Sequence, residues 1–321
     1  MTRCFSKIFF TLFICASSLA LHAQPQKKKY SQQLLLVSEN DSYTLKIIDR
    51  YYTNGIALRF SKALKEISKK KKILNAEIGQ SIYTAYDTRK NHYERSLDRP
   101  YTGFLYGKAG LSYLYKNENI LRWNVIAGVT GEAAKGQEVQ RFIHRFLGIK
   151  QAYGWQAQLR SDVAFNVQAS YTQHLIKPAN KKSFDAFIVT DAVVGTSFTK
   201  FSAGALFRLG ALESSYNSAW WDGRITSSNE EQNLKHHELF FYFEPSVVAQ
   251  AYNATLQGGL FADQDGRFTS EIEPFIYQHK FGLMYARKKW TAQLGYTYRT
   301  REAKTMFGKE VYGTIAIGYR F

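Results

Sequence analysis

Residues 156–172, QAQLRSDVAFNVQASYT, alternate between apolar and polar side chains. One set contains Ala157, Leu159, Val163, Phe165, Val167 and Tyr171, and the other contains Gln158, Arg160, Asp162, Asn166, Gln168 and Thr172. An alternation of period two is typical of a β-strand with one apolar face and one polar face. The stretch therefore predicts a strand longer than the five or six residues common in soluble sheets.

Two further stretches, WTAQLGYTY (290–298) and TIAIGYRF (314–321), repeat this pattern. A soluble β-sandwich would bury the apolar face, whereas a membrane β-barrel would turn it outward to lipid. The long strands and an aromatic content of 16% favour the barrel. The chain also stops on Phe321 within an alternating strand, which resembles the ending that outer-membrane barrels present to their assembly machinery. We therefore expect an all-β, transmembrane, antiparallel β-barrel, with the barrel-assembly machinery as a partner.

Segments of this kind occur twelve times, an even number, as a closed single-chain bacterial barrel requires. They lie near residues 32–39, 53–63, 73–84, 101–116, 119–131, 155–173, 183–196, 199–210, 237–256, 272–287, 289–301 and 310–321. The sequence indicates no second domain. Residues 24–321 are therefore expected to form a single outer-membrane β-barrel domain.

Residues 1–23 have the features of a secretory signal peptide. The apolar run IFFTLFICA follows a basic start, and a small-residue region ends at Ala23. Cys15 allows a lipoprotein alternative, but Ile14 before it is bulky where acylation sites prefer a small residue. Both cysteines lie within this peptide, so the exported chain is expected to be stabilised without disulfides. No later stretch reaches twenty apolar residues, which argues against a transmembrane helix.

The chain is strongly basic, with a formal net charge of +17. Nucleic acid is the usual partner of such a surface inside a cell, but an exported chain first meets other polyanions. The phosphates of lipopolysaccharide are the expected partner, and nucleic acid is not. A solvated, lysine-rich rim accounts for part of the charge, notably the run KKKK at 69–72.

A periplasmic N-terminus would place alternate connections on the extracellular side. These connections lie at about 39–53, 85–100, 131–155, 257–271 and 302–309. The segment 211–236 fits this topology poorly, because it is long and falls on the periplasmic side, where turns are normally short. It either folds back as a plug or cap, or the strand count is wrong there.

The extracellular loop 131–155 contains a short amphipathic helix. From Gly136 to Gly148 the apolar period changes from two to 3.6 residues, and Gly148 is placed as a helix stop. Gln140 and His144, four residues apart, lie on the same polar face of this helix. A single His on a solvated face usually has no role, and such a helix could also pack against the barrel rim.

The loop motifs change this interpretation. The stretches ENDS…DRYYTNG (39–55), DRPYTGF (98–104) and GQEVQRFIHRFLG…GW (136–155) resemble those of the outer-membrane lipid A 3′-O-deacylase family. The resemblance extends over nearly the whole exported chain, and GQEVQ followed by His144 is its most specific part. It implies a twelve-stranded barrel in the outer membrane of a Gram-negative bacterium that hydrolyses the ester of the 3′-linked acyloxyacyl group of lipid A. The implied active site lies between the barrel wall and the loop helix and faces the outer leaflet.

The implied mechanism resembles that of secreted phospholipases A2, in which a His activates water and Ca²⁺ helps to form the oxyanion hole. The positions that match the family are Asn40, Asp41, Thr53, Gln140 and His144. His144 would be the base, because imidazole titrates near neutrality. Asp41 would either contact Ca²⁺ or orient His144. Asn40, Thr53 and Gln140 would hold water, the ion or the ester carbonyl.

Cationic side chains in the same loops are expected to contact substrate phosphates: Arg50, Arg99 and Arg141. One position departs from the family pattern, because Lys150 stands where a carboxylate is usual, six residues after the His. A cation there cannot ligate Ca²⁺. The metal would then be held by fewer protein oxygens, by Glu138 or Glu39, or by substrate phosphate.

Two other readings are possible on the same sequence. A non-catalytic outer-membrane barrel, either a pore or a structural protein, would use these loops as surface decoration, since fold does not determine function. A serine-dependent outer-membrane phospholipase A would carry an HxSNG-like signature, but RFLG follows His144. No G-x-S-x-G occurs either, which argues against an α/β-hydrolase. Water as the nucleophile suits the residues that are present.

Overall fold

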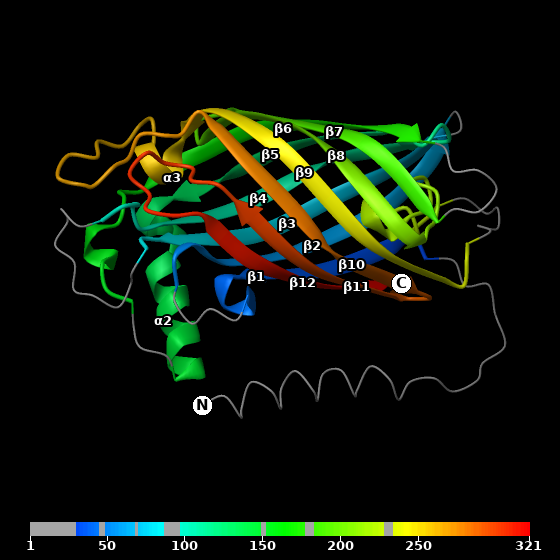
Figure 1. Cartoon of the computed structure of the whole chain (residues 1–321), viewed down its shortest axis with the longest axis horizontal. Helices are drawn as coiled ribbons and strands as arrows, with labels where there is room; N and C mark the ends of the chain where they lie inside the picture. The colour runs from blue at the N-terminus through cyan, green and yellow to red at the C-terminus, as the bar shows by residue number, and fades with distance from the viewer. Residues whose placement is uncertain are drawn as a thin grey trace.

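The computed structural model describes residues 30–44, 49–67, 70–86, 97–148, 152–176, 183–227 and 234–321. Its strands form one closed antiparallel barrel of twelve (Figure 1), which confirms the predicted fold. The strands are β1 (Gln32–Asn40), β2 (Tyr51–Ile67), β3 (Lys70–Thr84), β4 (Thr102–Tyr115), β5 (Ile120–Thr130), β6 (Asp162–Ile176), β7 (Phe184–Gly195), β8 (Phe198–Ala211), β9 (His237–Asn253), β10 (Phe275–Arg287), β11 (Trp290–Arg299) and β12 (Glu310–Arg320). β1 pairs with β12 from Gln33↔Arg320 to Asn40↔Gly313 and closes the barrel. The expected signal peptide lies outside the described residues.

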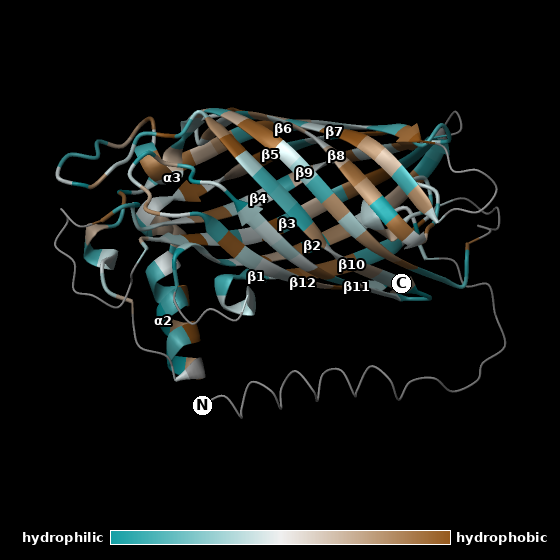
Figure 2. Ribbon diagram, in the orientation of Figure 1, coloured by the Kyte–Doolittle hydropathy of each residue, from teal (hydrophilic) through white to brown (hydrophobic). Residues whose placement is uncertain are grey.

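The alternating strands turn their apolar side chains outward. On β6, Val163, Phe165 and Val167 are 60%, 54% and 48% exposed, while Asn166 is buried. Figure 2 shows hydrophobic and hydrophilic residues mixed along the strands of the barrel. The interior holds a cavity of about 590 Å³ with charged residues of both signs in its lining: Glu39, Arg59, Glu77, Lys108, Arg122, Asp191, Lys200, Asp222, Glu244, Lys280, Arg299 and Glu302. This is the polarity of a membrane barrel rather than of a soluble sandwich. Among the described residues, no helix is long and apolar enough to cross a membrane.

The short helices are concentrated at the ends of the barrel. They are η1 (Asp41–Thr44), η3 (Gly131–Ala134), α2 (Gly136–Leu147), η4 (Trp155–Ala157), η5 (Ala219–Trp221) and α3 (Ala254–Gln257). Figure 1 shows α2 and α3 at the same end of the barrel, which we call the α2 end. The predicted helix between Gly136 and Gly148 is therefore present as α2.

The sequence pattern placed the start of β6 too early. The predicted strand 155–173 begins only at Asp162, because Trp155–Ala157 form the turn η4. The Trp155 ring is buried against Tyr101, with ring centroids 5.3 Å apart. Burial of this large ring outweighs the local alternation of side chains. β9 likewise ends at Asn253, whose side-chain oxygen accepts a hydrogen bond from the Thr255 amide and caps α3.

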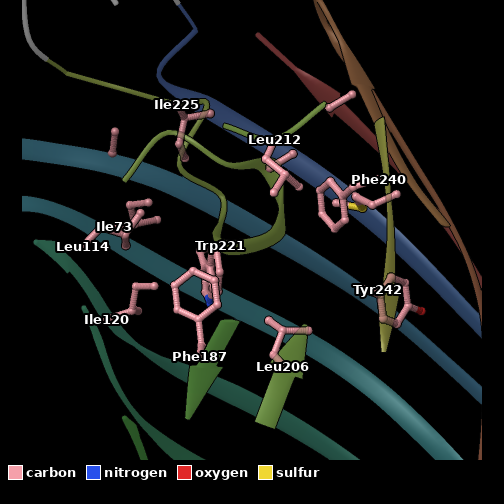
Figure 3. Close-up of a cluster of buried hydrophobic side chains, with 14 residues drawn as sticks. Ile73, Leu114, Ile120, Phe187, Leu206, Leu212, Trp221, Ile225, Phe240 and Tyr242 are labelled. Atoms are coloured by element: carbon pink, nitrogen blue, oxygen red, sulfur yellow. The ribbon is translucent and has the colours of Figure 1, made fainter. Parts of the chain in front are cut away.

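The segment after β8 forms a plug at the end opposite α2. Residues 212–227, named here the plug, fold into the barrel, and Leu212, Trp221 and Ile225 join a buried cluster with strand residues such as Phe187 and Phe240 (Figure 3). The observed strand count agrees with the prediction, so the alternative in which 211–236 folds back as a plug is correct for its described part.

Polar contacts attach the plug to the barrel wall. The buried Lys71 ammonium donates to the carbonyl oxygens of Tyr216 (2.8 Å) and Gly223 (2.6 Å). Gln33 on β1 donates to the Asp222 carboxylate at 2.9 Å. These donors lie on strands, so the plug is held by the same elements that form the wall, and it narrows the mouth opposite α2.

Candidate functional site

Close backbone packing positions α2 against the outer face of the barrel. A Cβ added to Gly103 on β4 would approach the Ala134 Cβ to 2.9 Å and the Gly136 Cα to 3.3 Å, so glycine permits this approach. Gln80 on β3 donates to the Ala134 carbonyl at 2.5 Å. Gly148, in the left-handed region at φ 68°, ends the helix. The face of α2 that carries His144 is thereby turned toward the barrel rim.

His144 contacts a carboxylate that the sequence analysis left without a role. Its Nε2 lies 2.7 Å from Oδ2 of Asp49, and the two side chains are only 4% and 16% exposed. This geometry is that of a histidine oriented by a carboxylate. Among the described residues, the carboxylate in contact with His144 is therefore that of Asp49 and not that of Asp41. The motif DRYYTNG contains Asp49, but an acidic residue in a polar loop gives no signal that distinguishes it from a solvated one.

Gln140 belongs to the same hydrogen-bond network. Its Nε2 donates to Asp49 Oδ2 at 2.8 Å, and its Oε1 accepts a bond from Trp155 Nε1 at 2.6 Å. Each end of the Gln140 amide thus has one protein partner, and Gln140 helps to fix the position of the Asp49 carboxylate. Its role toward water, an ion or the ester carbonyl stays a prediction.

Asp41 forms a second carboxylate centre close to Asp49. It is 2% exposed, and its Oδ2 accepts hydrogen bonds from the Arg50 amide (2.8 Å) and the Thr53 hydroxyl (3.1 Å). Its Oδ1 is buried without a hydrogen-bond partner among the described residues. Burial, followed by the charge of Asp49, raises the pKa of Asp41 well above its usual value. A cation or a hydrogen-bond donor would supply Oδ1 of Asp41 with a partner.

Asn40 lies beside Asp41 on the outer face of the barrel. Along β1, Leu35, Val37 and Glu39 line the interior cavity, and the intervening positions point outward. The Asn40 side chain bonds to the Asn54 side chain and accepts a bond from the Ser42 amide at 2.7 Å. The predicted residues thus lie in two groups, Asp41 with Thr53 beside Asn40, and Gln140 with His144 around Asp49. The charge of Asp49 acts on Asp41, so the two carboxylates are neighbours.

The three predicted phosphate-binding cations have different surroundings. Arg141 is exposed on α2, and the Arg50 guanidinium lies over the Tyr86 ring at 4.9 Å. Arg99 is fully buried and donates to Glu302 at 2.5 and 3.1 Å. The prediction for Arg99 is therefore wrong, because its guanidinium joins the second loop to the β11–β12 loop and is not open to a phosphate.

Asp98, from the motif DRPYTGF, organises the rim beside Asp41. Its carboxylate accepts bonds from the Tyr51 hydroxyl (2.7 Å) and from the amides of Tyr86 (2.9 Å) and Phe307 (3.1 Å). The Tyr51 hydroxyl in turn accepts a bond from the Gly308 amide at 3.0 Å. Residues from three separate segments are therefore held around one carboxylate.

These segments enclose a pocket of about 300 Å³ that adjoins the site. Its lining consists of Asp41, Arg50, Tyr86, Phe307, Gly308, Lys309 and Val311. The pocket combines two cations, one carboxylate and aromatic side chains. We refer to it as the rim pocket.

The described residues offer few ligands for Ca²⁺ near the site. Within the described part of the chain, no group of three His, Cys, Asp or Glu residues could hold a metal ion. Glu39 is directed to the interior, where it accepts a bond from the Tyr52 hydroxyl at 2.6 Å, and Glu138 is exposed beside Lys135. Lys150 lies outside the described residues. The uncommitted Oδ1 of Asp41 fits a hard cation, so the chain offers Ca²⁺ one carboxylate contact there.

Comparisons with known proteins agree with this architecture. The sequence model of the family described as "Outer membrane protein LpxR" matches residues 8–321. Among solved structures, LpxR from Salmonella typhimurium has a TM-score of 0.74 and 21% identity, covering 90% of this chain and 100% of that chain. The β domain of the Bordetella autotransporter BrkA gives a TM-score of 0.48 and 8% identity, covering 92% and 99% of the two chains. A comparison with curated proteins found no match.

Proposed function

Since the chain belongs to the family of outer membrane proteins described as LpxR, we propose that it is an esterase that removes the 3′-linked acyloxyacyl group of lipid A. The family and the barrel place the chain in the outer membrane. The observation that carries the proposed activity is the His144–Asp49 contact of 2.7 Å at the outer rim, beside the unpartnered Oδ1 of Asp41.

In this proposal His144 is the general base. Its Nε2 lies 2.7 Å from the Asp49 carboxylate, which orients the ring. The imidazole takes a proton from a water molecule whose oxygen attacks the ester carbonyl carbon. The tetrahedral intermediate then collapses, the bond to the 3′ oxygen breaks, and the imidazolium returns the proton to that oxygen. The products are a free acyloxyacyl acid and a 3′-hydroxyl, and Asp49 stabilises the imidazolium between the two steps.

Asp41 would act on the carbonyl group of the ester. Thr53 and the Arg50 amide fix one of its oxygens and leave Oδ1 for a ligand. A Ca²⁺ ion held by Asp41 would supply positive charge for the oxyanion, and removing such a stabilising group typically costs roughly a hundredfold or more in rate. Water, backbone oxygens and substrate phosphate would complete its coordination.

The outer position of the site supports a substrate in the outer leaflet. Asn40 continues the outward-facing positions of β1 that carry the exposed Leu34 and Leu36. We assign the α2 end to the extracellular side because most of the longer connections between strands emerge there, and lipid A would then reach the site laterally from the membrane. Lipid A phosphates would meet the cations of the rim, including Arg50 and Arg141.

The test is expression in an outer membrane that contains lipid A, followed by mass spectrometry of the lipid A. We expect loss of the 3′ acyloxyacyl mass with the wild-type chain and not with His144→Ala. His237→Ala is the matched control, because His237 is exposed at the end opposite α2. Unchanged lipid A despite an assembled wild-type barrel would favour the non-catalytic alternative. Activity that survives chelation of Ca²⁺ would contradict the metal part alone.

A further inference from the structure

The rim pocket has two cations, Arg50 and Lys309, in a lining that also includes the buried Asp41 and is held by the Asp98 carboxylate. No carboxylate of the described residues forms an ion pair with Arg50 or Lys309, which instead lie over the rings of Tyr86 (4.9 Å) and Tyr298 (5.2 Å). Neighbouring cations differ: Arg301 pairs with Glu273, and Lys304 pairs with Glu271. The aromatic rings hold the two pocket cations in place and leave their charge available to a ligand.

The pocket also has an apolar border. Phe307 is 74% exposed at its mouth, and Tyr86 lies edge-on to it with ring centroids 6.2 Å apart. Asp98 fixes both residues through their backbone amides. A large aromatic side chain that is held in place and exposed suits a ligand with a flat or apolar surface beside its anionic group.

We propose that the rim pocket binds the phosphate group of the same sugar that carries the hydrolysed ester, with Lys309 and Arg50 as its cations and Phe307 against the sugar and its acyl chain. This inference rests on the proposed function. In lipid A the 4′ phosphate is on the carbon next to the one that carries the 3′ ester. A phosphate site must therefore adjoin the catalytic groups, and Asp41 belongs to both the catalytic site and the pocket.

The experiment compares two purified substrates, lipid A with and without the 4′ phosphate. Wild-type protein is expected to prefer the phosphorylated substrate by roughly tenfold to a hundredfold in kcat/KM, the range for a charge-assisted contact. Lys309→Gln should lose that preference and Lys309→Arg should retain it. Lys304→Gln is the matched control, because Lys304 is on the same loop but pairs with Glu271 outside the pocket.

Each outcome has a defined meaning. Equal losses on both substrates, or no change in Lys309→Gln, would overturn the phosphate assignment while the proposed function stands. Hydrolysis of neither substrate by wild-type protein would refute the proposed function. Binding of the two lipids to His144→Ala then tests the pocket separately, and equal affinity for both lipids would overturn it.

A second inference rests on a different surface, the exposed side of α2. Phe142 and Phe146, one turn apart, are 69% and 80% exposed. Arg141 and Arg145 are exposed on the adjacent arc of the helix, while the arc with His144 faces the barrel. The helix therefore presents three separate arcs, one to the site, one apolar and one cationic.

The apolar arc continues the lipid-facing wall of the barrel. On β3, Ile78 is exposed on the outer face, and Gln80, two residues nearer the α2 end, is covered by the segment that leads into α2. We infer that α2 lies in the interface of the outer leaflet, with Phe142 and Phe146 among acyl chains and Arg141 and Arg145 at lipid phosphates.

Site-directed spin labelling tests this placement, because no cysteine occurs after residue 15. Nitroxides are attached to Phe146→Cys, Arg145→Cys and Ile78→Cys in barrels reconstituted in vesicles that contain lipid A. We expect Phe146→Cys to resemble Ile78→Cys, with high collision rates for oxygen and low rates for a water-soluble reagent, and Arg145→Cys to show the reverse. Equal access of the water-soluble reagent to positions 145 and 146 would overturn the inference, whatever the enzymatic result.

Discussion

Replacement of Asp49 by Asn tests the central contact of the site. The amide keeps the size of the side chain but removes the charge that faces His144 Nε2 at 2.7 Å. Gln140 Nε2 and His144 Nε2 both contact Oδ2, so an amide oxygen in that position accepts both bonds and only the charge is lost. A charge-assisted hydrogen bond contributes about 1.5–3 kcal/mol. The expected loss in kcat is therefore roughly tenfold to a hundredfold.

The assay is the initial rate of 3′ deacylation of purified lipid A in detergent micelles, measured by mass spectrometry over a range of pH. KM should change little, because Asp49 touches His144 and Gln140 rather than the substrate. Asp263→Asn, an exposed loop carboxylate, is the control. A kcat within threefold of wild type, or a loss confined to KM, would refute the reasoning.

Three further predictions follow from buried groups. Burial raises the pKa of Asp41, so the native state binds the Asp41 proton more tightly than the unfolded chain does. Stability is therefore lost as the pH rises above the pKa of this carboxyl in the unfolded chain. Asp41→Asn should raise the Tm more at pH 8 than at pH 4 while abolishing activity. Arg99→Ala should reduce the free energy of unfolding by about 3 kcal/mol, because it leaves the buried Glu302 with only the more distant Arg299, at 3.6 Å, as an ion-pair partner. Arg99→Met with Glu302→Leu should recover much of this loss. Trp221→Ala should reduce the free energy of unfolding by about 3–5 kcal/mol and increase conductance in planar bilayers, because it loosens the plug. A Tm, unfolding free energy or conductance equal to that of wild type would contradict the corresponding prediction.

The barrel was predictable because its pattern is long and repeated. An alternation such as that of Val163, Phe165 and Val167 specifies which side chains share a face, and strand length then separates lipid-facing from core-facing sheets. The plug was predictable only as one of two alternatives. Its burial depends on contacts such as Lys71 to Gly223, which are 152 residues apart in the chain and leave no local pattern.

The site was predictable to the level of its motifs but not of its pairings. His144 and Gln140 share a helix face by spacing alone, whereas the partner of each is decided by how the first loop folds back onto α2. Asp41 and Asp49 cannot be distinguished by residue type in the sequence. Only the packing of the loops brings Asp41 into contact with Thr53 and Asp49 into contact with His144. Arg99 shows the converse error, since a basic residue in a polar loop resembles a phosphate contact until its burial against Glu302 is known.

The proposed position of the site agrees with the polarity of the two faces of the barrel wall. The interior is polar and the plug narrows one mouth, so an acylated substrate would lose the burial of its chains by entering it. The outer wall is apolar to within two residues of Gln80, where α2 is attached. In the proposed function, His144 on the barrel-facing side of that helix would meet an ester whose acyl chains stay in the membrane. The wall would then keep the substrate in lipid, and the loops would need to supply only the base, its carboxylate and the cations for the sugar phosphate.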